Sequence, residues 1–116
     1  MEAILYYLLL RPKMKDLHEI AQAFKALSHP NRLQMYLELL ELREKIVASG
    51  DCQKKECSFG LSEFMHKLNI GAPTVSHHIK ELVNAKLIWV ERHGKFMTCH
   101  LNEEMRVQLE QFFGAK

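Results

Sequence analysis

The stretch TVSHHIKEL, residues 74–82, places His77 directly beside His78. Imidazole side chains can bind a metal ion, relay protons near neutral pH or donate hydrogen bonds to an external partner. Two histidines that hold one ion from a helix normally stand three or four residues apart on one face. Adjacent histidines do not meet that requirement, so the spacing disfavours a metal site built on this pair.

Helical periodicity predicts where each of these two rings points. Val75, Ile79 and Leu82 recur at spacings of four and three residues, which defines a buried helical face. His78 lies three residues beyond Val75 and is expected to pack or to form a hydrogen bond inside the protein. His77 is expected to face outwards, either as a contact to a partner or as an ordinary solvated side chain.

A second reactive pair is formed by Cys52 and Cys57, which four residues separate. Lys54 and Lys55 stand between them, and nearby cations lower the pKa of a thiol and favour the reactive thiolate. The pair could therefore capture a soft metal or metalloid or respond to an oxidant, or the two thiols could be incidental loop residues. No paired acids or glycine-rich loop accompany these groups, so an enzyme is not expected.

The composition is that of one ordinary globular domain spanning residues 1–116. The chain is 47% hydrophobic and 26% charged, with a formal net charge of +2. Three cysteines are too few for a disulfide framework and fit a reducing compartment. The apolar run at 3–10 stops well short of the roughly 20 residues that span a membrane, and no basic leader precedes it. We expect a cytoplasmic protein with no membrane partner.

The first half of the chain has the spacing of amphipathic helices. Helices are predicted over 3–10 and up to Leu27, followed by a longer one that Ser28 caps, that has Pro30 in its first turn and that Gly50 ends. Residues 49–60 lack a period and are predicted to be a loop. The expected buried positions of the two longer helices are Leu17, Ile20, Ala21, Phe24, Leu27, Leu33, Tyr36, Leu37, Leu40, and Ile46 or Val47.

The second half predicts a helix-turn-helix followed by a hairpin. Two short helices, with a glycine-containing turn between them, occupy about 61–85. Strand-like residues over about 87–101 are interrupted at His93 and Gly94, which predicts a β-hairpin, or wing, in which Cys99 lies on the apolar face. A last helix is predicted over 103–113. The fold class is therefore mainly α with a small β-hairpin, a winged helix-turn-helix, with the terminal helices at 3–27 and 103–113 available for dimerisation.

Three stretches together resemble the ArsR/SmtB family of winged-helix repressors. They are AFKALSHPNRLQMYLELL at 23–40, LSEFMHKLNIGAPTVSHHIKELVNAKLI at 61–88 and ERHGKFMTCHLN at 91–102. The resemblance covers roughly residues 16–113. It implies a homodimer that binds double-stranded operator DNA, with the second helix of the motif in the major groove and the hairpin along the phosphate backbone.

The polar side chains of these elements are the expected DNA contacts. Side chains at the leading end of a helix in the major groove can reach base edges, whereas basic groups on a hairpin bind phosphates and set the register. The expected base readers are Thr74, Ser76, His77 and Lys80, and the expected phosphate contacts are Arg92, His93 and Lys95.

The inducer is left open by the sequence. Many members of the family sense metals through a Cys-x-Cys pair in the first helix of the motif, but Gly60 and Ser62 stand at those positions here. The helix at 103–113 has no histidine or cysteine for a zinc site. A metal or metalloid ion, or a thiol oxidant, acting at Cys52 and Cys57 is one hypothesis. A repressor without a metal site, and a winged helix that binds proteins, are the alternatives.

Overall fold

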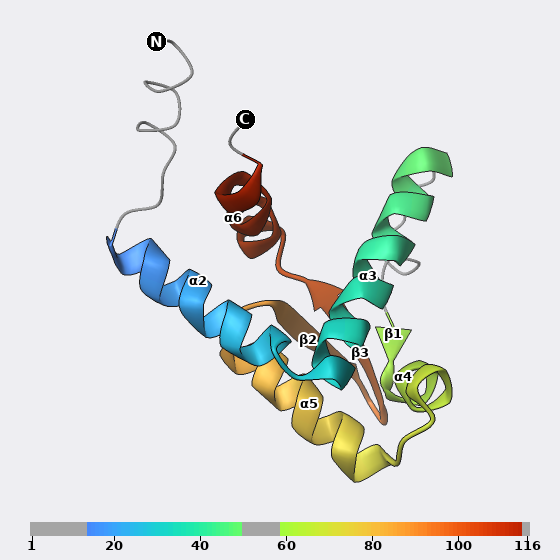
Figure 1. Ribbon diagram of the computed structural model, residues 1–116. Coiled ribbons are helices and arrows are strands. Elements are labelled where there is room, and N and C mark those ends of the chain that lie inside the picture. Colours follow the sequence, from blue (N-terminus) through green and yellow to red (C-terminus); the bar gives the residue numbers. More distant parts are fainter. Residues whose placement is uncertain (1–13, 50–58, 115–116) are drawn as a thin grey trace, which may run out of the picture.

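The computed structural model describes residues 14–49 and 59–114 and forms a winged helix-turn-helix (Figure 1). The helix predicted over 3–10, and Cys52 and Cys57, lie outside the described residues. Among these residues, none of the helices has the length and apolar character needed to cross a membrane. In chain order the elements are α2 (Met14–Leu27), α3 (Pro30–Ser49), β1 (Phe59–Gly60), α4 (Leu61–Leu68), α5 (Ala72–Asn84), β2 (Ile88–His93), β3 (Phe96–Leu101) and α6 (Glu103–Phe113).

His29, and not the predicted Ser28, caps the start of α3. The His29 ring nitrogen Nδ1 accepts a hydrogen bond from the backbone N–H of Asn31 at 3.2 Å. The Ser28 hydroxyl instead donates to the carbonyl of Lys25 at 2.6 Å and so closes α2. Because Pro30 is the first residue of α3, the capping position falls on the residue directly before it.

The buried faces of α2 and α3 are rotated from the prediction. Leu33 and Leu37 are exposed, at 41% and 52%, whereas Met35 and Leu39 are fully buried. Apolar residues nearly fill this part of α3, so periodicity alone could not choose the face. On α2 the small side chains of Ala23 and Ala26 are buried, Ile20 is buried as predicted, and Leu17 and Ala21 are exposed. On α3, Tyr36 and Ile46 are buried as predicted and Val47 is exposed.

The predicted helix-turn-helix is confirmed as α4 and α5. The N-terminus of α4 is stabilised by the carboxylate of Glu63, which accepts a hydrogen bond from the backbone N–H of Gly60 at 2.9 Å. Asn69 ends α4 in the left-handed conformation, with φ of 55°. Pro73 lies in the first turn of α5. Buried Phe64 on α4 and Val75 on α5 join the common core, which fixes α5 against the rest of the protein.

The predicted wing is confirmed as β2 and β3, but it belongs to a three-stranded antiparallel sheet. The order is β1-β3-β2, and Phe59 pairs with Cys99 at the edge. The prediction that residues 49–60 are all loop was therefore wrong at 59–60, because two residues are too few to show a period. A tight turn joins β2 to β3, and Gly94 has the positive φ of 60° that such a turn requires.

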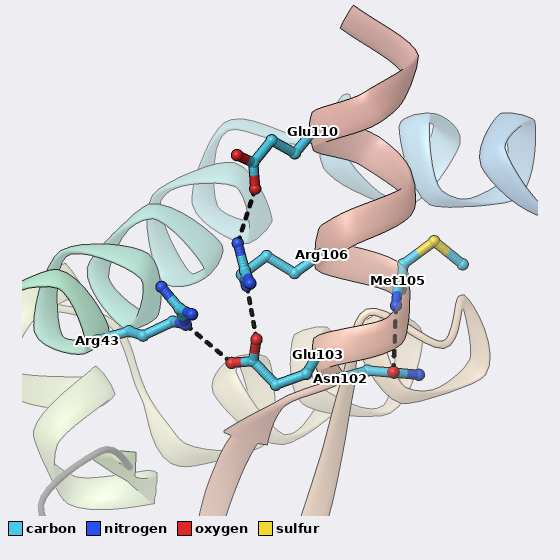
Figure 2. Close-up of polar contacts among 6 residues, drawn as sticks. All are labelled: Arg43, Asn102, Glu103, Met105, Arg106 and Glu110. Atoms are coloured by element: carbon cyan, nitrogen blue, oxygen red, sulfur yellow. Dashed lines mark hydrogen bonds and ion pairs between the residues drawn. The ribbon is translucent and has the colours of Figure 1, made fainter. Parts of the chain in front are cut away.

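A chain of ion pairs connects α6 to α3 (Figure 2). Arg43 donates to Glu103 at 2.9 Å, and Arg106 donates to the same carboxylate at 2.7 Å and to Glu110 at 2.9 Å. Burial opposes ionisation of Glu103, but the hydrogen bonds from Arg106 and Arg43 hold its pKa below the usual value. The side chain of Asn102 caps α6 by accepting a hydrogen bond from the backbone N–H of Met105. These contacts set the direction in which α6 leaves the sheet.

Candidate nucleic-acid interface

The outer face of α5 is polar and open to solvent. Val75 and Ile79 are buried, so the residues between them on the opposite side of the helix face outwards. The outward orientation predicted for His77 is confirmed, and all four base-reading candidates are exposed: Thr74, Ser76, His77 and Lys80. Within this helix the one large hydrophobic side chain with an open surface is Val83, at 37% exposure.

Two clefts separate α5 and α4 from the hairpin. The first, of about 540 Å³, runs between α5 and the inner side of the hairpin; its walls include Ser76, Lys80 and Arg92. The second, of about 610 Å³, lies between the start of α4 and the hairpin turn and is bounded by Ser76, Arg92, Lys95 and Phe96. Ser76 and Arg92 border both clefts, so α5 and the basic hairpin share one continuous surface.

The basic side chains of the hairpin have two kinds of surroundings: the cations are open to solvent, and the histidines lie beside a carboxylate. Arg92 and Lys95 are exposed, and neither forms an ion pair with any residue that the structure describes. His93 instead lies 2.9 Å from Glu91, whose other neighbour is His100 at 3.4 Å. The hydrogen bond from His93 is the main cause of the lowered pKa of Glu91. Within the described residues, Arg92 and Lys95 are thus open to an external anion, while His93 is held beside a carboxylate.

His78 is packed inside the protein. Packing was one of the two alternatives predicted for it, the other being an internal hydrogen bond. Only 4% of it is exposed, and neither ring nitrogen has a hydrogen-bond partner in the part of the chain that the structure describes. The ring of His29 lies 4.5 Å away, centroid to centroid, with Arg32 also nearby. Burial, and then the charges of His29 and Arg32, lower the pKa of His78 and keep it neutral. A neutral packed histidine can position α5 but is not available to a partner.

No metal centre is formed by the part of the chain at 14–49 and 59–114: it contains no group of three or more histidine, cysteine or acidic side chains arranged to hold an ion. Cys99 is fully buried, as predicted, and burial raises the pKa of its thiol to about 12. This thiol is protonated at neutral pH and is a poor nucleophile.

Two aromatic residues of the hairpin were not singled out from the sequence. Trp89 is half exposed and stacks on the ring of His100, with centroids 4.2 Å apart and planes 16° apart. Phe96, at the first position of β3, is 77% exposed. Strand alternation, counted from buried Cys99, would have placed Phe96 on the solvent side, and the hairpin register pairs Trp89 with His100 on that same side.

Neither the protein-family models nor the curated proteins include a match to this chain. Solved structures do match. An ArsR family transcriptional regulator superposes with a TM-score of 0.62 at 18% identity, with 84% of each chain covered. The transcriptional repressor BigR from Xylella fastidiosa superposes with a TM-score of 0.60 at 27% identity, with 82% of each chain covered.

A third similar structure is a homodimeric winged helix-turn-helix DNA-binding domain from Mycobacterium bovis. It is described as coming from a possible ArsR-family transcriptional regulator. Its TM-score is 0.60 at 18% identity, covering 85% of this chain and 80% of that one. The fold is that of the ArsR-family regulators. This confirms, at the level of the fold, the resemblance drawn from the three sequence stretches.

Proposed function

We propose that this chain is a sequence-specific DNA-binding transcriptional regulator, a repressor that acts as a homodimer and is released from its operator by a small inducer. The observation that carries the proposal is the continuous surface formed by the exposed polar face of α5 and the exposed cations of the hairpin, Arg92 and Lys95. Regulators and repressors with the same fold support it. We propose a DNA-binding role without enzymatic activity, in the cytoplasm.

The arrangement suits a major groove, which admits one helix and displays a distinct pattern of hydrogen-bonding groups for each base pair. The exposed hydroxyl of Ser76 and imidazole of His77 would reach base edges, with Thr74 and Lys80 beside them. Arg92 and Lys95 would bind the phosphates next to the groove and so fix the register of α5. His93, which was expected to assist them, is held by Glu91 at 2.9 Å.

A dimer interface on α2 and α6 is supported by their exposed apolar side chains. The ring of Phe24 on α2 packs against two rings on α6 and so joins the two helices. Its centroid lies 5.7 Å from that of Phe112 and 5.3 Å from that of Phe113. Phe113 is still 71% exposed, and Leu17 on α2 and Val107 on α6 are 40% and 38% exposed. Pairing of two such surfaces about a two-fold axis would bury them. The two reading helices would then lie about one DNA turn, roughly 34 Å, apart.

Induction requires a ligand that binds the DNA-free form more tightly than the DNA-bound form, by about 1 to 3 kcal/mol. We propose that Cys52 and Cys57 sense it, as a metal, a metalloid or an oxidant. The test measures DNA release by zinc, arsenite and a mild oxidant, in the parent chain and in the Cys52→Ser/Cys57→Ser variant. Release that the double variant lacks supports the thiols, whereas equal release in both chains would exclude them.

The reading face is tested by replacing Ser76 and His77 together with alanine. Both side chains are exposed, so the variant should fold normally while its preference for the operator over random DNA falls. Unchanged discrimination would remove both residues as readers. The rival function, a protein-interaction module, predicts weak DNA binding that is insensitive to salt and a broad apolar patch on α5. The polar surface of that helix disfavours the rival.

A further inference from the structure

Phe96 has the most exposed of the large hydrophobic side chains in the described part of the chain. It is 77% exposed and directly follows the turn formed by Gly94 and Lys95. Its backbone pairs with that of His93 at the last rung of the hairpin. None of the aromatic contacts among the described residues involves its ring. The side chain therefore contributes little to the core and projects from the tip of the wing.

The second strongly exposed aromatic residue has a different setting. Phe113 lies on α6, where its ring contacts Phe24 and Phe112 on the surface that we assign to dimerisation. Phe96 shares its cleft with Ser76, Arg92 and Lys95 instead. The apolar ring thus lies inside the surface that carries the phosphate-binding cations and the end of the reading helix.

We propose that Phe96 is a DNA-contacting residue that inserts its ring into the minor groove beside each half-site. The proposal rests on the proposed DNA-binding function. Binding of adjacent phosphates by Arg92 and Lys95 would hold the hairpin tip along the backbone, which brings the ring next to the groove that flanks the half-site. A phenyl ring gains nothing from a phosphate, but it can contact sugars and wedge against a base step.

This placement gives Phe96 a role in specificity that the polar face of α5 cannot supply. Wedging a ring at a base step partly unstacks that step, and the free-energy cost depends on the step. TA and CA steps deform easily, whereas stiffer steps resist. The ring would therefore favour easily deformed steps outside the half-sites, in DNA that α5 does not touch.

The experiment is selection of bound duplexes from a randomised pool, with the parent chain, Phe96→Ala and Val47→Ala. Val47 is a suitable control because it is 55% exposed on α3, outside both clefts. Affinities for the selected duplexes are then measured at several salt concentrations. We expect the parent and the control to enrich the same half-sites, flanked by TA or CA steps. Phe96→Ala should keep the half-sites, lose the flanking preference and bind roughly tenfold more weakly.

The salt dependence separates this contact from those of the cations. An apolar ring releases no counterions, so Phe96→Ala should leave the slope of log affinity against log salt unchanged. If Phe96→Ala keeps both the parent affinity and the parent preference for flanking steps, the inference is overturned and the proposed function stands. A flatter slope would also overturn it, by assigning the effect to displaced phosphate contacts. A parent chain that enriches no sequence would overturn both.

Discussion

The unpaired cation at the hairpin turn gives a quantitative prediction for DNA binding. Lys95 is exposed and forms no ion pair among residues 14–49 and 59–114, so Lys95→Ala should not alter the stability of the fold. Each phosphate contact contributes about 0.9 to the slope of log affinity against log salt. A dimer loses two such contacts, so the slope should become shallower by about 1.8. Between about 50 and about 200 mM salt, the ratio of parent to variant affinity should fall by roughly twelvefold.

The assay is fluorescence anisotropy of a labelled operator duplex across that range of salt, repeated with a duplex of random sequence. Both duplexes should show the same change, because phosphate contacts carry no sequence information. Lys45→Ala is the matched control, since the Lys45 side chain is 73% exposed on α3 and pairs only with Glu41 among the ion pairs described. Parallel salt plots for the parent and Lys95→Ala would refute the assignment of the hairpin turn to the phosphate backbone.

Three further predictions concern the scaffold behind this surface. Phe64→Ala empties a fully buried site and should lower the free energy of unfolding by about 3 to 5 kcal/mol in urea titration, whereas Leu37→Ala at a 52% exposed site should change it little. Because the pKa of His78 is lowered in the folded state, the unfolded state binds more protons, so stability should fall as the pH drops below the ordinary value of 6.5. His78→Leu should flatten that pH dependence. Cys99 should resist alkylation at neutral pH until the chain is denatured, and rapid labelling of the native protein would contradict its burial.

The helix-turn-helix and the hairpin were predictable because their signals are local. Val75, Ile79 and Leu82 mark one face of a short helix, and that spacing also determined which histidine faces outwards. The turn at Gly94 needed a residue that tolerates positive φ, and glycine marks it in the sequence. The polar candidates on α5 and the hairpin followed from these two elements, together with the resemblance to repressors of this fold.

The remaining features depend on contacts between distant parts of the chain. The choice of Met35 and Leu39 over Leu33 as buried positions is made by packing against other elements, since apolar residues lie on both sides of α3. Strand β1 exists because Phe59 pairs with Cys99, forty positions further along. The ion pair between Arg43 and Glu103 has the same long-range origin. Single-sequence periodicity contains none of this information.

Sequence-specific binding by a dimer is tested by titrating a labelled duplex from the chain's own upstream region, at physiological salt, against a scrambled duplex of the same length. We expect saturation at two chains per duplex and an affinity at least about a thousandfold higher than for the scrambled sequence. Equal affinity for the two duplexes would contradict sequence-specific recognition, and saturation at one chain per duplex would contradict the dimer.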